Sequence, residues 1–124
     1  VMEQNNAIYR EQSLLVQELA ENSDCVIVGR SADYILRDKN PLRLFIYADM
    51  ESRMERCRKR APEQEHFTDK ELRRHIQDVD KRRSKYYQFF TGQTWGEKLN
   101  YDLCINTSGA NIEDLVKVIA KLVK

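Results

Sequence analysis

Arg30 is the first residue of this sequence whose type and position could do chemistry. It follows Gly29 at the end of a short apolar run, residues 25–28, so a strand there would place its guanidinium at the carboxyl edge of a sheet. Open α/β sheets bind ligands at that edge, and the planar donors of Arg suit phosphate. Ser31 and Asp33 add a hydroxyl and a carboxylate. We therefore expect this corner to bind a hydroxylated, phosphorylated molecule.

Two more groups of cations lie on predicted helices. Arg53, Arg56 and Arg60 recur at i, i+3 and i+7, so they share one helix face. Later in the chain, Asp80 lies among the lysines and arginines of residues 78–85. We expect the acids of this segment to hold its arginines in place, because a segment that only followed a phosphate backbone would not need them.

Helices and strands alternate along the chain and must position these cations. The predicted helices cover about residues 3–21, 31–38, 50–60, 69–90 and 112–123. The predicted strands cover residues 25–28, 42–47 and 101–105. The expected helix N-caps are Asp49, Thr68 or Asp69, and Asn111. This alternation indicates an α/β fold with a parallel, layered sheet.

The composition is ordinary for a globular chain of 124 residues, which is one domain or part of one. It is 41% hydrophobic and 33% charged, with a net charge of +1. The charge is uneven, because residues 53–85 hold 12 Lys and Arg against 7 Asp and Glu. No apolar run reaches the roughly 18 residues of a membrane span, and the N-terminus has no signal-peptide pattern. A cytoplasmic protein without a membrane partner is predicted.

The cysteines and the basic segments exclude two further classes of function. Cys25 and Cys104 lie in predicted strands and are expected to be buried, reduced thiols, like Cys57. No spacing of His, Cys and acids is typical of a metal site, so no metal ligand is predicted. A nucleic-acid partner is not expected either, because the net charge is near zero and no aromatic residues interleave with the basic run after residue 53.

The order of these features resembles the distal part of the nucleoside monophosphate kinases, and specifically the cytidylate kinase-like family. Five segments carry the resemblance, which covers most of residues 7–123: residues 28–36, 45–51, 80–87, 91–96 and 101–107. It implies a three-layer parallel sheet with flanking helices, as in P-loop kinases. It also implies phosphoryl transfer from ATP, with Mg²⁺, to CMP or a related pyrimidine nucleoside monophosphate.

The resemblance places five charged residues in a lid, a mobile segment of about residues 53–90 that closes over the phosphates: Arg53, Arg56, Asp80, Arg82 and Arg83. Arg53 and Arg56 match its beginning. Asp80 and Arg83 match the Asp and Arg pair at its end, where the Arg contacts phosphate. If the match is shifted by one residue, Arg82 takes the place of Arg83. A closing lid supplies charge and excludes water, which phosphoryl transfer needs.

Four residues are implied on the acceptor side. Arg30 corresponds to the arginine that reaches the transferring phosphoryl group or the acceptor phosphate. Ser31 stands where better-known cytidylate kinases have an Asp that contacts the nucleoside, and Asp33 is the candidate substitute. This departure leaves the preference for cytosine open. Arg10 on the first helix is a weaker candidate for the acceptor phosphate.

On the donor side, Thr107 and Ser108 match the loop near the adenine. The phosphate loop Gly-x-x-x-x-Gly-Lys-Ser/Thr does not occur in the printed sequence, where none of the 4 glycines is followed by Lys. Residues 1–124 are therefore interpreted as a partial domain that lacks the central strand of its sheet and is inactive alone. Its uncovered sheet edge favours strand exchange or a homo-oligomer. The alternative is a non-catalytic remnant that binds a nucleotide or a partner chain.

Overall fold

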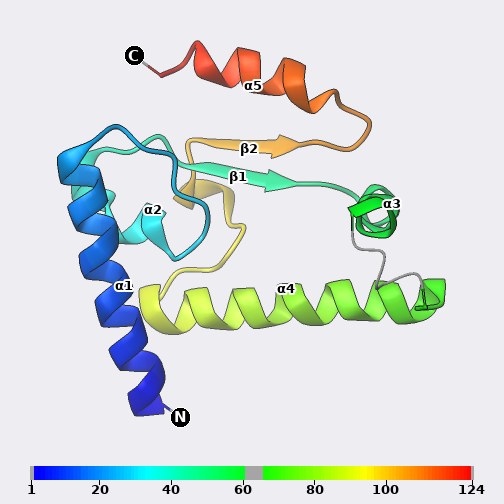
Figure 1. Ribbon diagram of the computed structural model, residues 1–124, viewed down its shortest axis with the longest axis horizontal. Helices are drawn as coiled ribbons and strands as arrows, with labels where there is room; N and C mark the ends of the chain where they lie inside the picture. The colour runs from blue at the N-terminus through cyan, green and yellow to red at the C-terminus, as the bar shows by residue number, and fades with distance from the viewer. Residues whose placement is uncertain (1, 61–65, 124) are drawn as a thin grey trace. The chain divides into compact units, whose positions relative to one another are not determined.

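The structure is a computed structural model that describes residues 2–60 and 66–123 (Figure 1). The chain divides into two compact units, one ending at Pro41 and the other beginning at Leu42. Each unit is described separately. In the described ranges, no helix combines the length and the apolar character that crossing a membrane would require.

The first unit is a helix followed by an irregular segment and a short helical corner. Its elements are α1 (Met2–Asn22), α2 (Ala32–Ile35) and the 3-10 helix η1 (Arg37–Lys39). Val16 on α1 packs with Ala32 and Leu36 to form a small core, and Ala20, Ile27 and Ile35 cover its edge. The predicted first helix is thus confirmed, and Val16 and Ala20, one turn apart on it, pack against the following corner.

The predicted strand at residues 25–28 is wrong. The segment has no regular secondary structure, and the sheet of the described residues contains two other strands only. Val26 is 95% exposed and Val28 is 87% exposed, and the Cys25 thiol is exposed instead of buried. An apolar run becomes a strand only where a neighbouring strand accepts its hydrogen bonds, and here none is described.

A tight turn replaces the start of the predicted helix 31–38. Gly29, Arg30 and Ser31 follow one another with φ values of 71°, 62° and 53°. A left-handed conformation is uncommon for residues other than Gly, so Arg30 and Ser31 make this a strained corner. The helix itself is split into α2 and η1, and it ends where Asn40, also at positive φ, precedes Pro41.

The second unit is built around two parallel strands, β1 (Leu44–Tyr47) and β2 (Leu103–Asn106). Leu44 is paired with Leu103, and Tyr47 with Asn106. These strands lie between α5 (Ile112–Ala120) on one side and α4 (Asp69–Thr91) on the other (Figure 1). A mixed α/β architecture with a parallel sheet is confirmed, whereas the wider three-layer sheet of the P-loop kinases stays a prediction.

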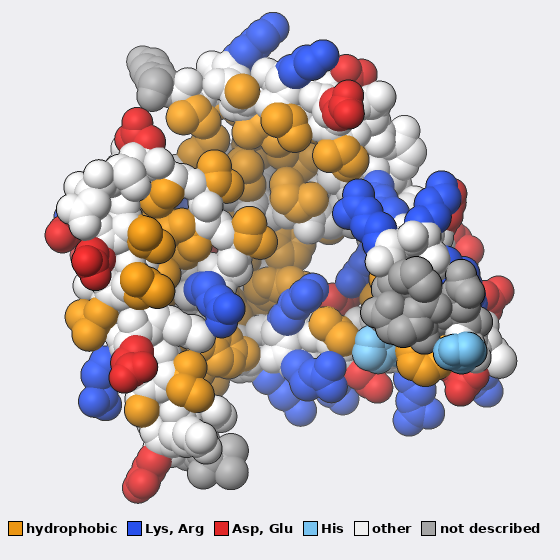
Figure 2. All heavy atoms as spheres, in the orientation of Figure 1, with side chains coloured by type: hydrophobic (Ala, Val, Ile, Leu, Met, Phe, Trp, Pro, Cys, Tyr) orange, Lys and Arg blue, Asp and Glu red, His pale blue; other side chains and the backbone are white. Residues whose placement is uncertain are grey.

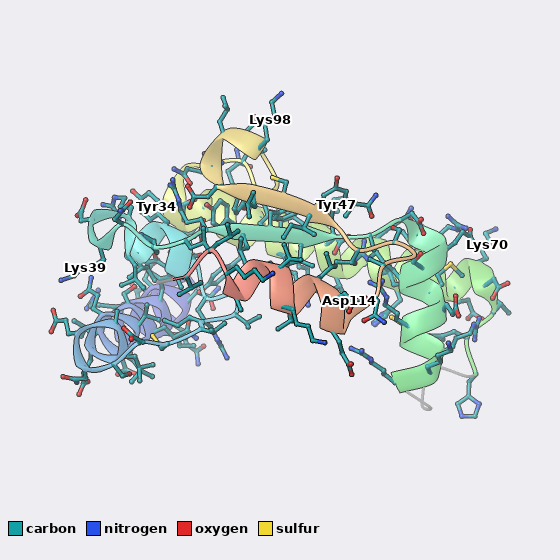
Figure 3. The ribbon with its side chains drawn as sticks, turned by 90° about the horizontal axis from the view of Figure 1, so that it is seen from above. Tyr34, Lys39, Tyr47, Lys70, Lys98 and Asp114 are labelled. Atoms are coloured by element: carbon teal, nitrogen blue, oxygen red, sulfur yellow. The ribbon has the colours of Figure 1, made fainter. Side chains whose placement is uncertain are left out.

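The helix α3 (Met50–Arg60) crosses the N-terminal half of α4 and packs against it, which is the best-buried contact of the unit (Figure 1). Met54, Leu72 and Ile76 form its core, and Leu72 has no exposed surface. Ion pairs reinforce the contact at the helix surfaces: Arg58 with Asp69 and Arg73 with Glu51. Figure 3 shows β1 ending at Tyr47 beside α3, with Lys70 in the first turn of α4 close by.

The helices of the second unit begin at the residues that their sequences predict. Thr68, rather than Asp69, is the N-cap of α4, and its side chain and that of Glu71 form a reciprocal capping box. Asp49 accepts from the Ser52 backbone N–H at 2.7 Å, and Asn111 caps α5. The connection after α4 is turn-rich, as predicted, and contains the short 3-10 helix η3 (Lys98–Asn100).

These caps predict a loss of stability in acid. Among the described residues, three carboxyls have a pKa below the ordinary value, in each case mainly because a backbone N–H donates to them: Asp49 and Glu71 at caps, from Ser52 and Thr68, and Asp102 away from the caps, from Arg43. A carboxyl with a depressed folded-state pKa stabilises the fold above its unfolded pKa and loses that contribution as the pH falls through the folded value. The melting temperature is therefore expected to fall from about pH 5 downward.

Circular dichroism melts between pH 7 and pH 3 would measure this. Glu71→Gln keeps the capping hydrogen bonds and removes one titration, so its melting temperature is expected to change less with pH than that of the wild type. A variant with an unchanged pH slope would contradict the role of Glu71.

Apolar surface remains open on the sheet and on α5. Ile46 on β1 and Leu103 on β2 are exposed, as are Val116 and Val118 on α5, and hydrophobic side chains gather over these elements in Figure 2. The predicted burial of Cys104 is wrong as well, because its thiol on β2 is exposed.

Candidate functional site

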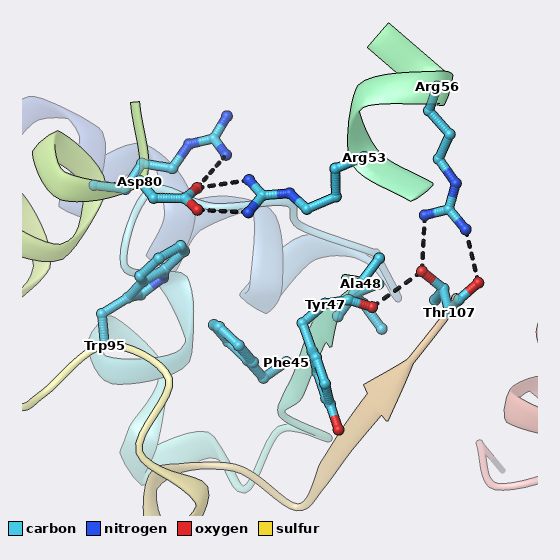
Figure 4. Close-up of a pocket in the computed structure, with 10 residues that line it drawn as sticks. Phe45, Tyr47, Ala48, Arg53, Arg56, Asp80, Trp95 and Thr107 are labelled. Carbon is cyan, nitrogen blue, oxygen red and sulfur yellow. Dashed lines mark hydrogen bonds and ion pairs between the residues drawn. The ribbon is translucent and has the colours of Figure 1, made fainter. Parts of the chain in front are cut away.

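An open pocket of about 400 Å³ lies in the second unit, where β1 ends beside α3, α4 and the loop after β2 (Figure 4). Its lining combines aromatic, apolar and charged side chains: Phe45, Ile46, Tyr47, Ala48, Arg53, Arg56, Asp80, Arg83, Trp95 and Thr107. Five of these residues are site candidates from the sequence. The surrounding surface is basic, since Lys and Arg side chains gather over α3 and along α4 (Figure 2).

Arg53 on α3 and Asp80 on α4 form the central ion pair of the pocket. The two terminal guanidinium nitrogens donate to the two carboxylate oxygens at 2.6 and 2.8 Å (Figure 4). Both side chains are partly buried, and the hydrogen bonds to Asp80 raise the pKa of Arg53 although burial opposes the shift. Bidentate geometry of this kind fixes the plane of the guanidinium. Asp80 thus holds an arginine in place, as its position in the sequence predicts.

Arg83 joins the same carboxylate from the next turn of α4. Its terminal nitrogen lies 4.0 Å from Asp80, and its side chain is 64% exposed. The contact is long, so little holds the guanidinium where it is. Arg82, the alternative register, is exposed on α4 and does not line the pocket.

Arg56, one turn further along α3, reaches the loop after β2. Its terminal nitrogens donate to the hydroxyl of Thr107 at 2.9 Å and to the Thr107 carbonyl at 2.7 Å. The hydroxyl in turn donates to the carbonyl of Tyr47 at 3.0 Å, and the Thr107 backbone N–H donates to that carbonyl at 2.8 Å (Figure 4). This chain of bonds joins α3 to the ends of both strands.

Ser108, the other predicted donor-side residue, ties the same loop to the start of α3. Its hydroxyl accepts from the backbone N–H of Asp49 at 2.7 Å, and its own N–H donates to the side chain of Asn106. The predicted contact of Thr107 and Ser108 with an adenine stays a prediction.

Sequence reasoning missed the aromatic wall of the pocket. Phe45 contacts Trp95 edge to face at 5.2 Å and Tyr101 at 5.0 Å between ring centroids. Gly96 has φ 83°, and a side chain there would come within 3.2 Å of the Phe45 ring. The available signal was the period of two along β1, which puts Phe45 and Tyr47 on one face.

The remaining candidates lie in the first unit, and the pocket is formed by residues of the second unit alone. Arg30 is exposed on the strained corner and Ser31 is buried there. Asp33 is partly buried on α2, and Arg10 is exposed on α1. Their predicted roles toward the acceptor stay predictions.

The donor set does not fit a resident Mg²⁺. Divalent magnesium takes carboxylate and water oxygens, but Asp80, the one carboxylate among the described residues that line the pocket, is engaged by Arg53. Residues 2–60 and 66–123 contain no group of three or more His, Cys, Asp or Glu side chains placed to hold a metal ion.

Comparison with known proteins assigns the family. The model of the cytidylate kinase-like family matches residues 2–109. The chain belongs to the cytidylate kinase-like family. The resemblance of the sequence motifs is thereby confirmed, and membership indicates a kinase-like, and so transferase-like, function at the level of the family. A search of curated proteins finds no match.

A solved structure supports the fold of this cytidylate kinase-like chain. It is the crystal structure of an uncharacterized protein from Eubacterium ventriosum, with 28% sequence identity and a TM-score of 0.76. The similarity covers 93% of this chain and 62% of that protein, so the chain spans less than two thirds of its structural relative.

Proposed function

We propose that the protein transfers the γ-phosphoryl group of ATP to CMP or a related pyrimidine nucleoside monophosphate. The observation that carries this proposal is the convergence of Arg53, Arg56 and Arg83 on one pocket whose described lining residues include a single carboxylate, Asp80. Such an excess of guanidinium groups suits the charge of two phosphorylated substrates. Family membership supports the reaction class.

In the proposed reaction a phosphate oxygen of the acceptor attacks the γ-phosphorus of ATP. The bond from that phosphorus to the β–γ bridging oxygen breaks, and ADP leaves with the electron pair. The Arg83 side chain is exposed and only loosely paired, so it can change rotamer as the phosphoryl group moves. Asp80 holds Arg53 in one orientation. The helices α3 and α4 are the two arms of the proposed lid, residues 53–90, and the core around Leu72 keeps them together.

The donor phosphates need a binding loop that the printed sequence does not contain. Without it, positioning of ATP is incomplete, and positioning accounts for most of the catalysis in phosphoryl transfer. We therefore expect residues outside these 124 to supply that loop, and the 124 residues alone to be inactive.

A coupled phosphotransfer assay of the full-length protein tests the proposal. With ATP as donor, we expect turnover of CMP, dCMP or UMP to exceed turnover of AMP and GMP. Ser31 leaves the order among the three pyrimidine acceptors open. No turnover with any of the three would contradict the acceptor assignment.

The missing loop also favours a second function, a kinase-like module that binds a nucleotide without phosphorylating it. Calorimetric titration with CMP separates the two functions. Binding of CMP by a full-length protein that shows no turnover would favour the second.

A further inference from the structure

The arginines of the pocket differ in what holds them. Arg53 donates to both oxygens of a carboxylate, so its charge is locally balanced. Arg56 donates instead to a hydroxyl and a carbonyl, both from Thr107. Neutral acceptors orient a guanidinium without neutralising it.

The positive charge of Arg56 is therefore available to an anionic group outside these contacts. No ion pair of Arg56 lies among the contacts of residues 2–60 and 66–123. Arg56 lowers the pKa of Asp49, but less than any other cause of that shift, the largest being the hydrogen bond from the Ser52 backbone N–H. Within the part of the chain that the structure describes, Arg56 is thus oriented by neutral acceptors and has no ionic partner.

Thr107 is well suited to orient it. The residue is 4% exposed, and two bonds hold it to the carbonyl of Tyr47, one from its hydroxyl and one from its N–H. Since the hydroxyl hydrogen is given to Tyr47, the oxygen presents its lone pairs to Arg56. The Thr107 hydroxyl is therefore held in one position and acts as an acceptor toward Arg56.

A guanidinium has five N–H donors, and Thr107 takes two of them. We propose that Thr107 is a positioning residue, which aims the remaining donors of Arg56 at a phosphate group of the nucleotide. The inference rests on the proposed function, because it assigns a role within the same pocket. It changes the expected role of the Thr107 side chain, from a direct contact with the nucleotide to a support for Arg56.

Titration of the full-length protein with inorganic pyrophosphate, followed by calorimetry, tests this inference without requiring turnover. Thr107→Val removes the hydroxyl at nearly constant volume and leaves the backbone bond to Tyr47 in place. We expect it to weaken pyrophosphate binding about tenfold, the effect of losing one hydrogen bond to a charged group. Thr107→Ser restores the hydroxyl and is expected to bind within about twofold of the wild type.

Asn111→Ala is the matched control for a loss of stability in the same loop. Its side chain caps α5 and is not among the residues that line the pocket, so the variant should lower the melting temperature and leave pyrophosphate affinity unchanged. If Thr107→Val does not fold, Thr107→Ala takes its place in the test, because it removes the same hydroxyl with a smaller side chain.

Three results would overturn the inference: wild-type affinity in the Val variant, equal weakening by Val and Ser, or no binding of pyrophosphate by the wild type. The proposed function fails separately. A protein that phosphorylates no nucleotide, but whose pyrophosphate affinity depends on Thr107, contradicts the function and leaves the inference standing. If the Thr107→Val variant phosphorylates CMP with the KM of the wild type, the proposed function stands and the role of Thr107 is contradicted.

Discussion

Arg83→Ala is expected to lower turnover of the full-length protein about 10²- to 10³-fold, the effect of removing one donor that stabilises developing charge. The loss of stability should be small. Arg83 is 64% exposed and lies 4.0 Å from Asp80, and pairs of this kind contribute at most about 1 kcal/mol. The measurements are steady-state kinetics with CMP and a thermal melt.

Lys85→Ala is the control for a general loss of positive charge on α4. Lys85 is exposed, two residues further along the helix, and does not line the pocket. Its removal should leave turnover within about twofold, as for other surface charges outside a site. Equal losses of turnover in both variants would show that the net charge of α4, and not Arg83, assists the reaction. A fall in melting temperature that matches the fall in turnover would mean that Arg83 acts on the fold.

The second large effect is expected on stability, from Leu72→Ala. Leu72 is fully buried between α3 and α4 and packs with Met54 and Ile76. Its truncation leaves a cavity among side chains that cannot fully close it, which costs about 2–5 kcal/mol. Because folded proteins are stable by only about 5–15 kcal/mol, much of the folding free energy would be lost.

Urea denaturation measures this change, with Leu99→Ala as the matched substitution. Leu99 is 82% exposed, so the same truncation there should change the free energy of unfolding by about 0.5 kcal/mol or less. If both variants unfold at the wild-type midpoint, the α3–α4 contact does not carry the stability of the second unit.

The longer helices could be predicted from the sequence, because the signals that begin them are local, whereas the predicted helix 31–38 is split into α2 and η1. Thr68 and Glu71 lie three residues apart and form their capping box across that interval. The strand at residues 25–28 could not, because an apolar run carries no information about whether another strand lies beside it. Val28 is as apolar as a core residue and is nearly fully exposed.

The site was predictable in its residue types and less so in its contacts. Helical spacing along α3 and the acids near residue 80 indicate the cations and the group that holds them. The pair of Arg53 with Asp80, however, joins two helices and spans 27 residues, and the bond of Arg56 to Thr107 spans 51. Contacts at such separations depend on how α3, α4 and β2 pack. The aromatic wall was missed for a related reason, because Trp95 lies on a turn without periodicity.

That turn has a practical consequence. Trp95 is the only tryptophan in the printed sequence, and its indole lines the pocket beside Phe45 and Asp80 (Figure 4). Indole fluorescence responds to the polarity and charge of its surroundings. The chain therefore carries an intrinsic optical probe at its own candidate site, and we expect its fluorescence to change on ligand binding without a label or a coupled enzyme.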